Sequence, residues 1–357
     1  MKKGKRSKRK KGNKPRLGLI LIVLILLLVF AGAYAAQYCY KILKYPNVGV
    51  ELEIYEVNIP TGSDLDKLVK QLFAKAVLID SGTFRLVANL RKYENVKPGK
   101  YFVPAGINNW DLVAMLRAGE HKPVRLIVRH ARQRKELVRR VAKTLEVDSN
   151  TLAALLEDEV FLRQYGFTPP TSTSVIIPNS YDFYWNTNAT QFFERMLKEY
   201  DNFWSVEKLQ QADSLELTQL EVITIASIVQ EETRKIDEMS RIAGVYLNRL
   251  NRNWPLEADP TLKFAAGDWT IRRVLKKHKK IDSPYNTYKY KGLPPGPICI
   301  PEIPAIEAVL NAESHHFMFF CAKEDFSGYH NFARNLREHN RNARKFHAAL
   351  NKKKIYR

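Results

Sequence analysis

The segment ASIVQEETRK, residues 226–235, places a solid apolar run directly before two adjacent glutamates. Residues three, four or seven apart share one face of a helix, so Glu232 continues the stripe of Ile225 and Val229. Glu231 falls nearer the polar side, and we expect it to point toward water. A carboxyl group among apolar neighbours is costly to ionise, so the pKa of Glu232 should be raised. A proton retained near neutral pH is what a general acid needs.

The same pattern leaves two other interpretations of Glu232 open. An inward glutamate can form an ion pair with an arginine, and Arg241 and Arg249 follow at suitable positions. Alternatively, the apolar stripe simply ends at a surface cleft. Periodicity by itself therefore indicates a catalytic carboxyl group without deciding for it.

The charge of the chain lies mostly at its two ends. The 357 residues, enough for two or three domains, are 45% hydrophobic and 27% charged, with a net charge of +21. Residues 1–16 hold ten Lys or Arg and residues 341–357 hold seven, with no acid in either tail, so the body carries only +4. Nucleic-acid binding requires a basic face on a folded domain, and we therefore expect no nucleic-acid partner.

Residues 17–36, LGLILIVLILLLVFAGAYAA, form an uncharged run. Its length matches the roughly 20 residues of a membrane-spanning helix, and the basic tail before it predicts a cytoplasmic N-terminus. A cleaved signal peptide is the competing interpretation, because Ala33-Tyr34-Ala35 fits the small-residue cleavage pattern. We favour a retained single-pass anchor in the cytoplasmic (inner) membrane with the body exported to the periplasmic side, since the run is longer than a usual signal core.

The exported body mixes strand and helix patterns, which predicts an α+β fold. Residues 37–50 are expected to be a linker. In the next region IPTG, residues 59–62, is echoed by VPAG, residues 103–106, each before an amphipathic helix, and Ser63 is expected to cap the first. These are interpreted as small repeated units, with a third strand–helix pair in residues 124–145. The aromatic segment 169–192 is interpreted as either a packed mini-core or a carbohydrate-binding surface. Residues 217–250 predict one long helix or two joined ones.

Six motifs follow one another within the region 217–345: ASIVQEET, AGVYLNRL, WPLEADPTLKF, YNTY, GLPPGPI and EHN. Together they closely resemble the MltG (YceG-like) endolytic murein transglycosylases, a family that is also similar upstream in its single membrane helix and LysM-like region. The resemblance implies a LysM-like region at 51–122, an intermediate α/β region at 123–216, an α+β catalytic domain with a glycan cleft at 217–350, and a basic tail at 351–357.

The resemblance also assigns site residues. The family's catalytic glutamate directly precedes the Thr of its E-x-E-T segment, which maps onto Glu232 before Thr233; the earlier acid of that segment is Gln230 here. The chain departs from the family at Glu257, where a Gln is common, and at Pro301-Glu302, where the family has Pro-Gly. Six further positions match the family and are expected to bind substrate: Asn248, Asp259, Thr261, Tyr285, Asn286 and Tyr288.

The implied reaction is cleavage of bonds between N-acetylmuramic acid (MurNAc) and N-acetylglucosamine (GlcNAc) in nascent glycan strands, leaving 1,6-anhydro ends. Glu232 would protonate the leaving oxygen and then accept the proton of the muramic 6-hydroxyl as it attacks C1. Because the substrate supplies the nucleophile, no second carboxylate is required, unlike in most glycosidases. Asp259 is interpreted as loop-fixing, with a catalytic role as the alternative. For Tyr285, Asn286 and Tyr288, packing of a loop is an equally good interpretation.

We expect no cofactor and no metal, because His315 and His316 would diverge, His330 and His339 lack a ligand triad, and no phosphate loop occurs. Cys299 and Cys321 are expected either to pair or to stay free. The expected partners are peptidoglycan strands, the membrane and, by resemblance alone, peptidoglycan synthases and the elongation or division machinery. Two rival functions stay open, namely a wall-binding scaffold without catalysis and a muramidase-type hydrolase.

Overall fold

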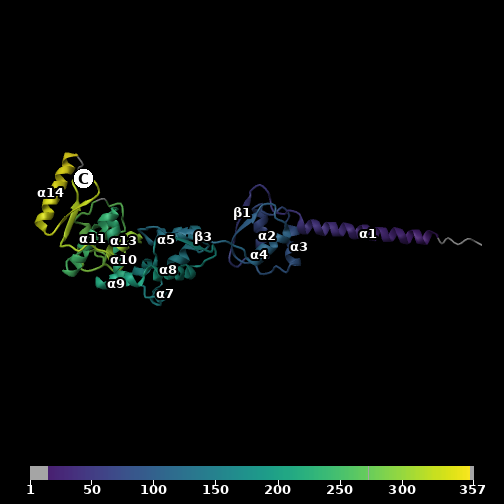
Figure 1. The fold of residues 1–357 in the computed structure, drawn as a ribbon, viewed down its shortest axis with the longest axis horizontal. Coiled ribbons are helices and arrows are strands. Elements are labelled where there is room, and N and C mark those ends of the chain that lie inside the picture. The colour runs from purple at the N-terminus through teal and green to yellow at the C-terminus, as the bar shows by residue number, and fades with distance from the viewer. Residues whose placement is uncertain (1–14, 272, 354–357) are drawn as a thin grey trace, which may run out of the picture. The chain divides into compact units, whose positions relative to one another are not determined.

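The computed structural model describes residues 15–271 and 273–353. They form two compact units, divided between Lys122 and Pro123, and each unit has its own hydrophobic core (Figure 1). Most of the predicted basic N-terminal tail, residues 1–14, and the end of the C-terminal one, residues 354–357, lie outside the described residues. The division of the body into finer domains stays a prediction.

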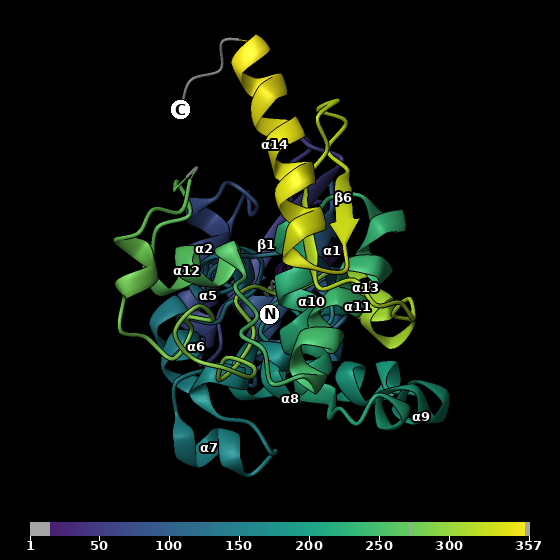
Figure 2. The ribbon, with the colours of Figure 1, turned by 90° about the vertical axis from the view of Figure 1, so that its left-hand side faces the viewer.

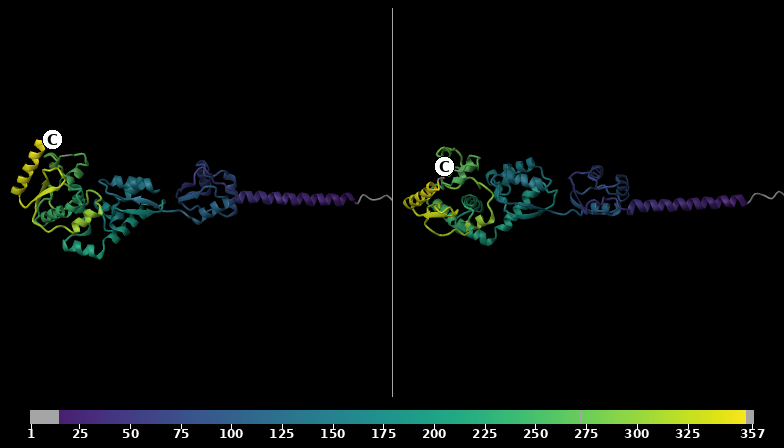
Figure 3. Two further views of the ribbon diagram at one scale, coloured as in Figure 1. Left: turned by 45° about the horizontal axis from the view of Figure 1, so that its top comes forward. Right: turned by 90° about the horizontal axis from the view of Figure 1, so that it is seen from above.

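Helix α1 (Pro15–Lys44) contains the apolar run and extends well beyond its predicted end at residue 36. Its segment Gly18–Lys44 is long and apolar enough to cross a membrane, which is consistent with a single-pass anchor. Residues 37–50 do not form a separate linker. The helix continues to Lys44, and Asn109 donates a hydrogen bond to the carbonyl of Ile42 over 3.0 Å. Residues 46 and 48 form β-bridges with residues 108 and 78 of the same unit. In both views of Figure 3, α1 runs directly into that unit.

The first unit continues with β1 (Ile54–Ile59), α2 (Leu65–Ala74), α3 (Ser81–Leu90), β2 (Gly99–Pro104) and α4 (Asn109–Ala118). Strands β1 and β2 pair with each other in antiparallel register, Ile59 opposite Gly99. The two expected repeats therefore share one sheet and one core, since a single strand and helix is too small to bury its own apolar face. Helix α2 is capped by Asp64 instead of Ser63, because the Asp64 carboxylate accepts the Lys67 amide at 2.7 Å. The LysM-like character of this region stays a prediction.

The second unit holds the remaining elements. In chain order they are β3 (Val124–Ile127), α5 (Arg134–Thr144), α6 (Ser149–Leu155), α7 (Glu159–Arg163), the 3₁₀ helix η1 (Pro169–Val175), β4 (Ser180–Phe183), α8 (Ala189–Phe203), α9 (Val206–Ser214), α10 (Gln219–Glu232), α11 (Ile236–Asn251), α12 (Asp259–Ala265), η2 (His278–Lys280), α13 (Ile303–Leu310), β5 (Phe319–Ala322), β6 (His330–Ala333) and α14 (Leu336–Lys352). Strand β3 pairs with β4 and β5 with β6, both antiparallel. The predicted mixture of helices and strands is confirmed.

Helix α10 is the centre of the second unit. Thr218 caps its start and forms a reciprocal capping box with Glu221, and all residues from Val222 to Val229 are buried. Helices α11 and α13 pack against it (Figure 2). The sequence left open one long helix or two, and the structure has two. The backbone of Thr233 is extended, so α10 ends at Glu232, and both glutamates lie at its C-terminal end.

The structure decides between alternatives that the sequence left open. The aromatic segment 169–192 is a core element: Phe183 and Phe192 are buried with ring centroids 5.6 Å apart, so the mini-core interpretation holds for these rings. The thiols of Cys299 and Cys321 are free.

Candidate active site

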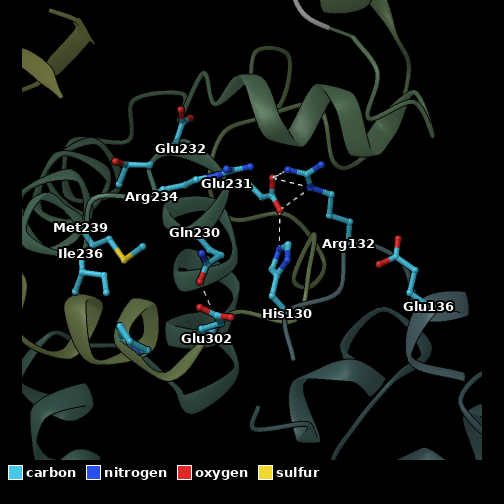
Figure 4. A pocket seen from close by; sticks show the side chains of 12 residues that line it. His130, Arg132, Glu136, Gln230, Glu231, Glu232, Arg234, Ile236, Met239 and Glu302 are labelled. Carbon is cyan, nitrogen blue, oxygen red and sulfur yellow. Dashed lines mark hydrogen bonds and ion pairs between the residues drawn. The ribbon is translucent and has the colours of Figure 1, made fainter. Parts of the chain in front are cut away.

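The two glutamates at the end of α10 point in different directions (Figure 4). Glu231 was expected to face water, but its side chain is only 6% exposed. Its Oε1 lies 2.8 Å from His130 Nε2, and Arg132 Nε donates to both carboxylate oxygens at 3.0 Å. The expectation was wrong because α10 is enclosed on nearly all sides, so its nominally polar face meets the segment between β3 and α5 instead of solvent.

These contacts decide the charge of Glu231. Burial raises the pKa of its carboxyl group, but the hydrogen bonds with His130 and Arg132 and the positive charge of Arg132 outweigh burial and bring that pKa below its ordinary value. The pKa of Arg132 is raised in turn, mainly by its hydrogen bond to Glu231. Glu231 is therefore held as a carboxylate at neutral pH.

Glu232 has the opposite environment. Its side chain is half-buried, and its Oε1 accepts a hydrogen bond from the Tyr246 hydroxyl of α11 at 2.6 Å. Burial raises the pKa of Glu232 to about 7, the Asp259 carboxylate adds to that rise, and the Tyr246 hydroxyl opposes it. Adjacent carboxyl groups with pKa values pushed apart are typical of acid–base sites.

The arginine interpretation of Glu232 does not fit this geometry. Arg241 pairs with Glu313 at 2.8 Å. Arg249 is buried and donates to the carbonyls of Met318 and Leu256. Within the described part of the chain, neither arginine forms an ion pair with Glu232.

Both glutamates line a hollow of about 810 Å³. This volume lies within the range of about 300–1,000 Å³ found for ligand pockets. Its walls are strongly polar, as Figure 4 shows, and come from the segment before α5, the end of α10, the start of α11 and the start of α13. The amide of Gln230 faces the last of these and accepts the backbone N–H of Glu302 at 3.1 Å, which ties α10 to α13. The lining is His130, Arg132, Glu136, Gln230, Glu231, Glu232, Thr233, Arg234, Ile236, Met239, Glu302 and Pro304.

Two of the predicted substrate-binding residues lie near Glu232 with exposed or half-buried side chains. The Tyr288 hydroxyl donates to Asp259 Oδ1 at 2.6 Å, and the Asp259 charge acts on Glu232. Asp259 begins α12 and is exposed. Its hydrogen bond to Tyr288 joins α12 to the loop of that tyrosine, as loop fixing requires, and its accessible position also suits charge stabilisation.

Three others fix loops. The amide of Asn286 is fully buried, donates to the carbonyls of residues 279 and 281, and accepts the N–H groups of residues 288 and 289. Thr261 is buried and bonds to the Thr287 hydroxyl at 2.8 Å. Asn248 donates to the carbonyls of residues 315 and 317, which joins α11 to the chain before β5. Their amide and hydroxyl groups are engaged within the protein, so packing is the interpretation that the geometry favours.

Tyr285 lines a different hollow from Glu232. Its ring packs on Phe264 with a centroid distance of 4.5 Å, and both rings line a second hollow of about 270 Å³. Sugar stacking on this pair stays a prediction.

Three residues of the site were not identified from the sequence. Tyr246 lies within the motif AGVYLNRL, but its contact with Glu232 depends on how α11 packs on α10. His130 and Arg132 stand about 100 positions before Glu231 and belong to none of the quoted motifs. They could be identified only by knowing that the segment between β3 and α5 packs against the end of α10.

Three potential metal ligands lie close together around Glu231. Ligand atoms of His130, Glu231 and Cys299 lie within 4.8 Å of one another. Two features oppose a cation there. Arg132 already neutralises Glu231, and burial raises the pKa of the Cys299 thiol well above its ordinary value, which keeps it protonated.

Comparison with known proteins decides the family. Residues 57–345 match the model of the YceG-like family. The chain belongs to the YceG-like family. The resemblance drawn from the motifs is therefore confirmed.

Two relatives of this YceG-like chain share the name endolytic murein transglycosylase. The endolytic murein transglycosylase of Bacillus subtilis (strain 168) is 27% identical over 313 residues, covering 83% of this chain and 86% of the relative. That of Streptococcus pneumoniae (strain D39) is 27% identical over 356 residues, covering 90% of this chain but only 63% of the relative. The crystal structure of a YceG-like protein from Listeria monocytogenes has a TM-score of 0.53 and 26% identity, covering 81% of this chain and 98% of that one.

The raised pKa of Glu232 predicts a pH-dependent effect on stability. The Glu232 carboxyl group holds its proton up to about pH 7 in the folded protein but only up to about pH 4.5 in the unfolded chain. The free energy of unfolding therefore falls as the pH rises between those two values. Glu232→Gln should therefore be more stable than the wild type at pH 8, by about 1–3 kcal/mol, and gain little at pH 4.5. Urea unfolding followed by tryptophan fluorescence measures this. The exposed Glu207→Gln is the control, and an equal effect at both pH values would contradict the prediction.

For Glu231 we expect the opposite dependence of the free energy of unfolding on pH. Its lowered pKa stabilises the fold above the ordinary carboxyl pKa and loses that effect as the pH falls through the folded-state value. Glu231→Gln leaves Arg132 without its counter-charge, so we expect a loss of about 1–3 kcal/mol at pH 7, reduced because Arg132 is partly exposed. The loss should shrink in the same unfolding experiment at pH 3.5. Wild-type stability at pH 7 would show that the pair contributes nothing.

Proposed function

We propose that this protein is a membrane-anchored endolytic lytic transglycosylase of peptidoglycan, with Glu232 as its general acid and base. Membership of the YceG-like family and the names of the relatives support transglycosylase activity on murein. The observation that carries the role of Glu232 is its pKa of about 7 at the edge of a polar hollow, next to a glutamate that stays ionised. Such a group can both release and take up a proton near neutral pH.

The reaction begins with proton transfer from Glu232. The protonated carboxyl group donates to the oxygen between MurNAc C1 and the GlcNAc residue, and the C1–O bond breaks as GlcNAc leaves with the proton as a hydroxyl group. The carboxylate of Glu232 then accepts the proton of the muramic 6-hydroxyl while O6 bonds to C1. The product is a 1,6-anhydro ring, no water is consumed, and Glu232 ends the cycle protonated.

The neighbouring acids have other parts in this scheme. Glu231 is tied to Arg132 and His130, so it is neither a proton donor at neutral pH nor a free nucleophile. Asp259, held by Tyr288, supplies negative charge that can stabilise the positive charge developing at C1. The same carboxylate could instead activate water, and this is the specific observation behind the rival hydrolase.

The proposed location follows from the helix α1. Residues 17–36 would span the cytoplasmic membrane, the basic residues 1–16 would stay inside, and both units would act on the outer side. Contacts with peptidoglycan synthases and with the elongation or division machinery are part of the same hypothesis and rest on family resemblance alone.

The products of glycan digestion test the reaction. The full-length protein should release fragments with 1,6-anhydro ends, identified by mass spectrometry, and Glu232→Gln should lower the rate about 10²–10⁴-fold because general acid–base catalysis is lost. Glu207→Gln should keep full activity. Reducing ends would support the hydrolase, no cleavage by the wild type would support a scaffold, and full activity of Glu232→Gln would rule out the mechanism.

The Tyr246 hydrogen bond makes a separate prediction. Because Glu232 must be protonated to act, kcat/KM should fall above about pH 7. The Tyr246 hydroxyl stabilises the ionised form, so Tyr246→Phe should raise the pKa of Glu232 and move this decline to higher pH by about one unit. Tyr165→Phe, far along the chain from this contact, is the control. A decline that stays in place or moves to lower pH in Tyr246→Phe argues against Glu232 as the titrating acid.

A further inference from the structure

The hollow beside Glu232 is the first of three neighbouring hollows in the second unit. Arg132 lines both the first hollow and the second, which lies against Phe264 and Tyr285. Arg134 lines both the second hollow and a third one of about 750 Å³. Because consecutive hollows share a wall residue, they lie next to one another in a series that runs from Glu232 toward α5 and α6.

We call the third hollow the α5 groove. Its floor contains the apolar side chains of Val138, Ala142 and Ala153, and its remaining lining is Arg134, Lys135, Arg139, Lys143, Ser149, Asn150 and Glu157. The groove thus combines an apolar floor with a cationic rim. This combination suits a chain that carries both carboxylates and small apolar side groups.

The cations of the rim form a row. Lys135, Arg139 and Lys143 are exposed and follow one another at intervals of four residues, so they lie on one face of α5 and span about 12 Å. None of the three forms an ion pair with another described residue. Like charges at this spacing destabilise a helix. A row of unneutralised charges beside an open groove therefore points to an anionic partner from outside the chain.

Arg134 differs from the row. Its guanidinium group is paired with Glu157 and donates to the carbonyl of Pro169, which fixes the start of α5 to η1. It belongs to the wall between the second hollow and the α5 groove and holds that wall in place. The three exposed cations, by contrast, are available to a ligand.

We propose that the α5 groove binds the anionic peptide side chains of the glycan strand that is cleaved at Glu232. This proposal rests on the proposed function, because it assumes that the strand whose peptides lie in the α5 groove is the strand that is cleaved at Glu232. The lactyl group of each muramic residue carries a short peptide with free carboxylates and alanine methyl groups, which match the cationic rim and the apolar floor. The protein would thereby favour peptide-bearing strands over strands that have lost their peptides.

Binding to two forms of the same strand tests this proposal. Full-length Glu232→Gln in detergent, which avoids turnover, is titrated with fluorescent uncrosslinked glycan strands that keep their peptides and with the same strands stripped by an amidase. We expect about tenfold tighter binding of the peptide-bearing form at low salt, with a preference that falls as salt rises. Adding Lys135→Gln, Arg139→Gln and Lys143→Gln should abolish the preference and leave binding of stripped strands unchanged.

A matched variant separates position from total charge. Lys198→Gln, Arg337→Gln and Lys352→Gln remove the same charge from exposed sites in the same unit outside the three hollows, and should keep the preference. Equal binding of both strand forms, or an unchanged preference in the α5 variant, overturns the proposal while leaving the proposed function intact. Binding of neither form overturns both. If polyglycerol phosphate binds through the three cations and peptide-bearing strands do not, the groove serves another polymer and the proposal is also wrong.

Discussion

The end of helix α10 poses one physical problem, namely that two neighbouring carboxyl groups stand where burial and the negative end of a helix dipole both oppose negative charge. The protein accommodates them in different ways. Glu231 receives an arginine and a histidine as partners and stays ionised, whereas Glu232 receives a single hydroxyl group and keeps its proton up to about pH 7. The packing around α10 therefore creates an acid and a carboxylate from adjacent copies of one residue type.

The rest of the second unit serves to hold these partners in place. Helix α11 brings the Tyr246 hydroxyl to Glu232, and the chain between β3 and α5 brings His130 and Arg132 to Glu231. The loops on the other side are made rigid by buried polar groups, chiefly the amide of Asn286 and the hydroxyl pair of Thr261 and Thr287. Several residues that the family motifs share thus use their polar groups to hold the walls of the site, and a cleft needs fixed walls before it can orient a substrate.

Prediction from sequence succeeded where the signal was local. The apolar run of α1, the amphipathic helices and the inward direction of Glu232 all depend on residues within a few turns of one another. It failed for Glu231, because helical periodicity assumes a single buried face and α10 is covered on nearly all sides. It also treated two strand–helix segments as separate units, although β1 and β2 pair across some 40 residues. Neither error could be seen without knowing which distant segments meet.

By itself, therefore, the sequence determined the membrane-competent helix, the mixed helix and strand content, the family and the glutamate with the raised pKa, since each depends on composition, local periodicity or an ordered set of motifs. Only the tertiary structure decided which side chains pair with Glu231, which hydroxyl group contacts Glu232, and that a series of neighbouring hollows leads from them toward α5. These features depend on contacts between residues up to about 100 positions apart. Such contacts are set by packing of whole helices, and no local pattern in the chain encodes them.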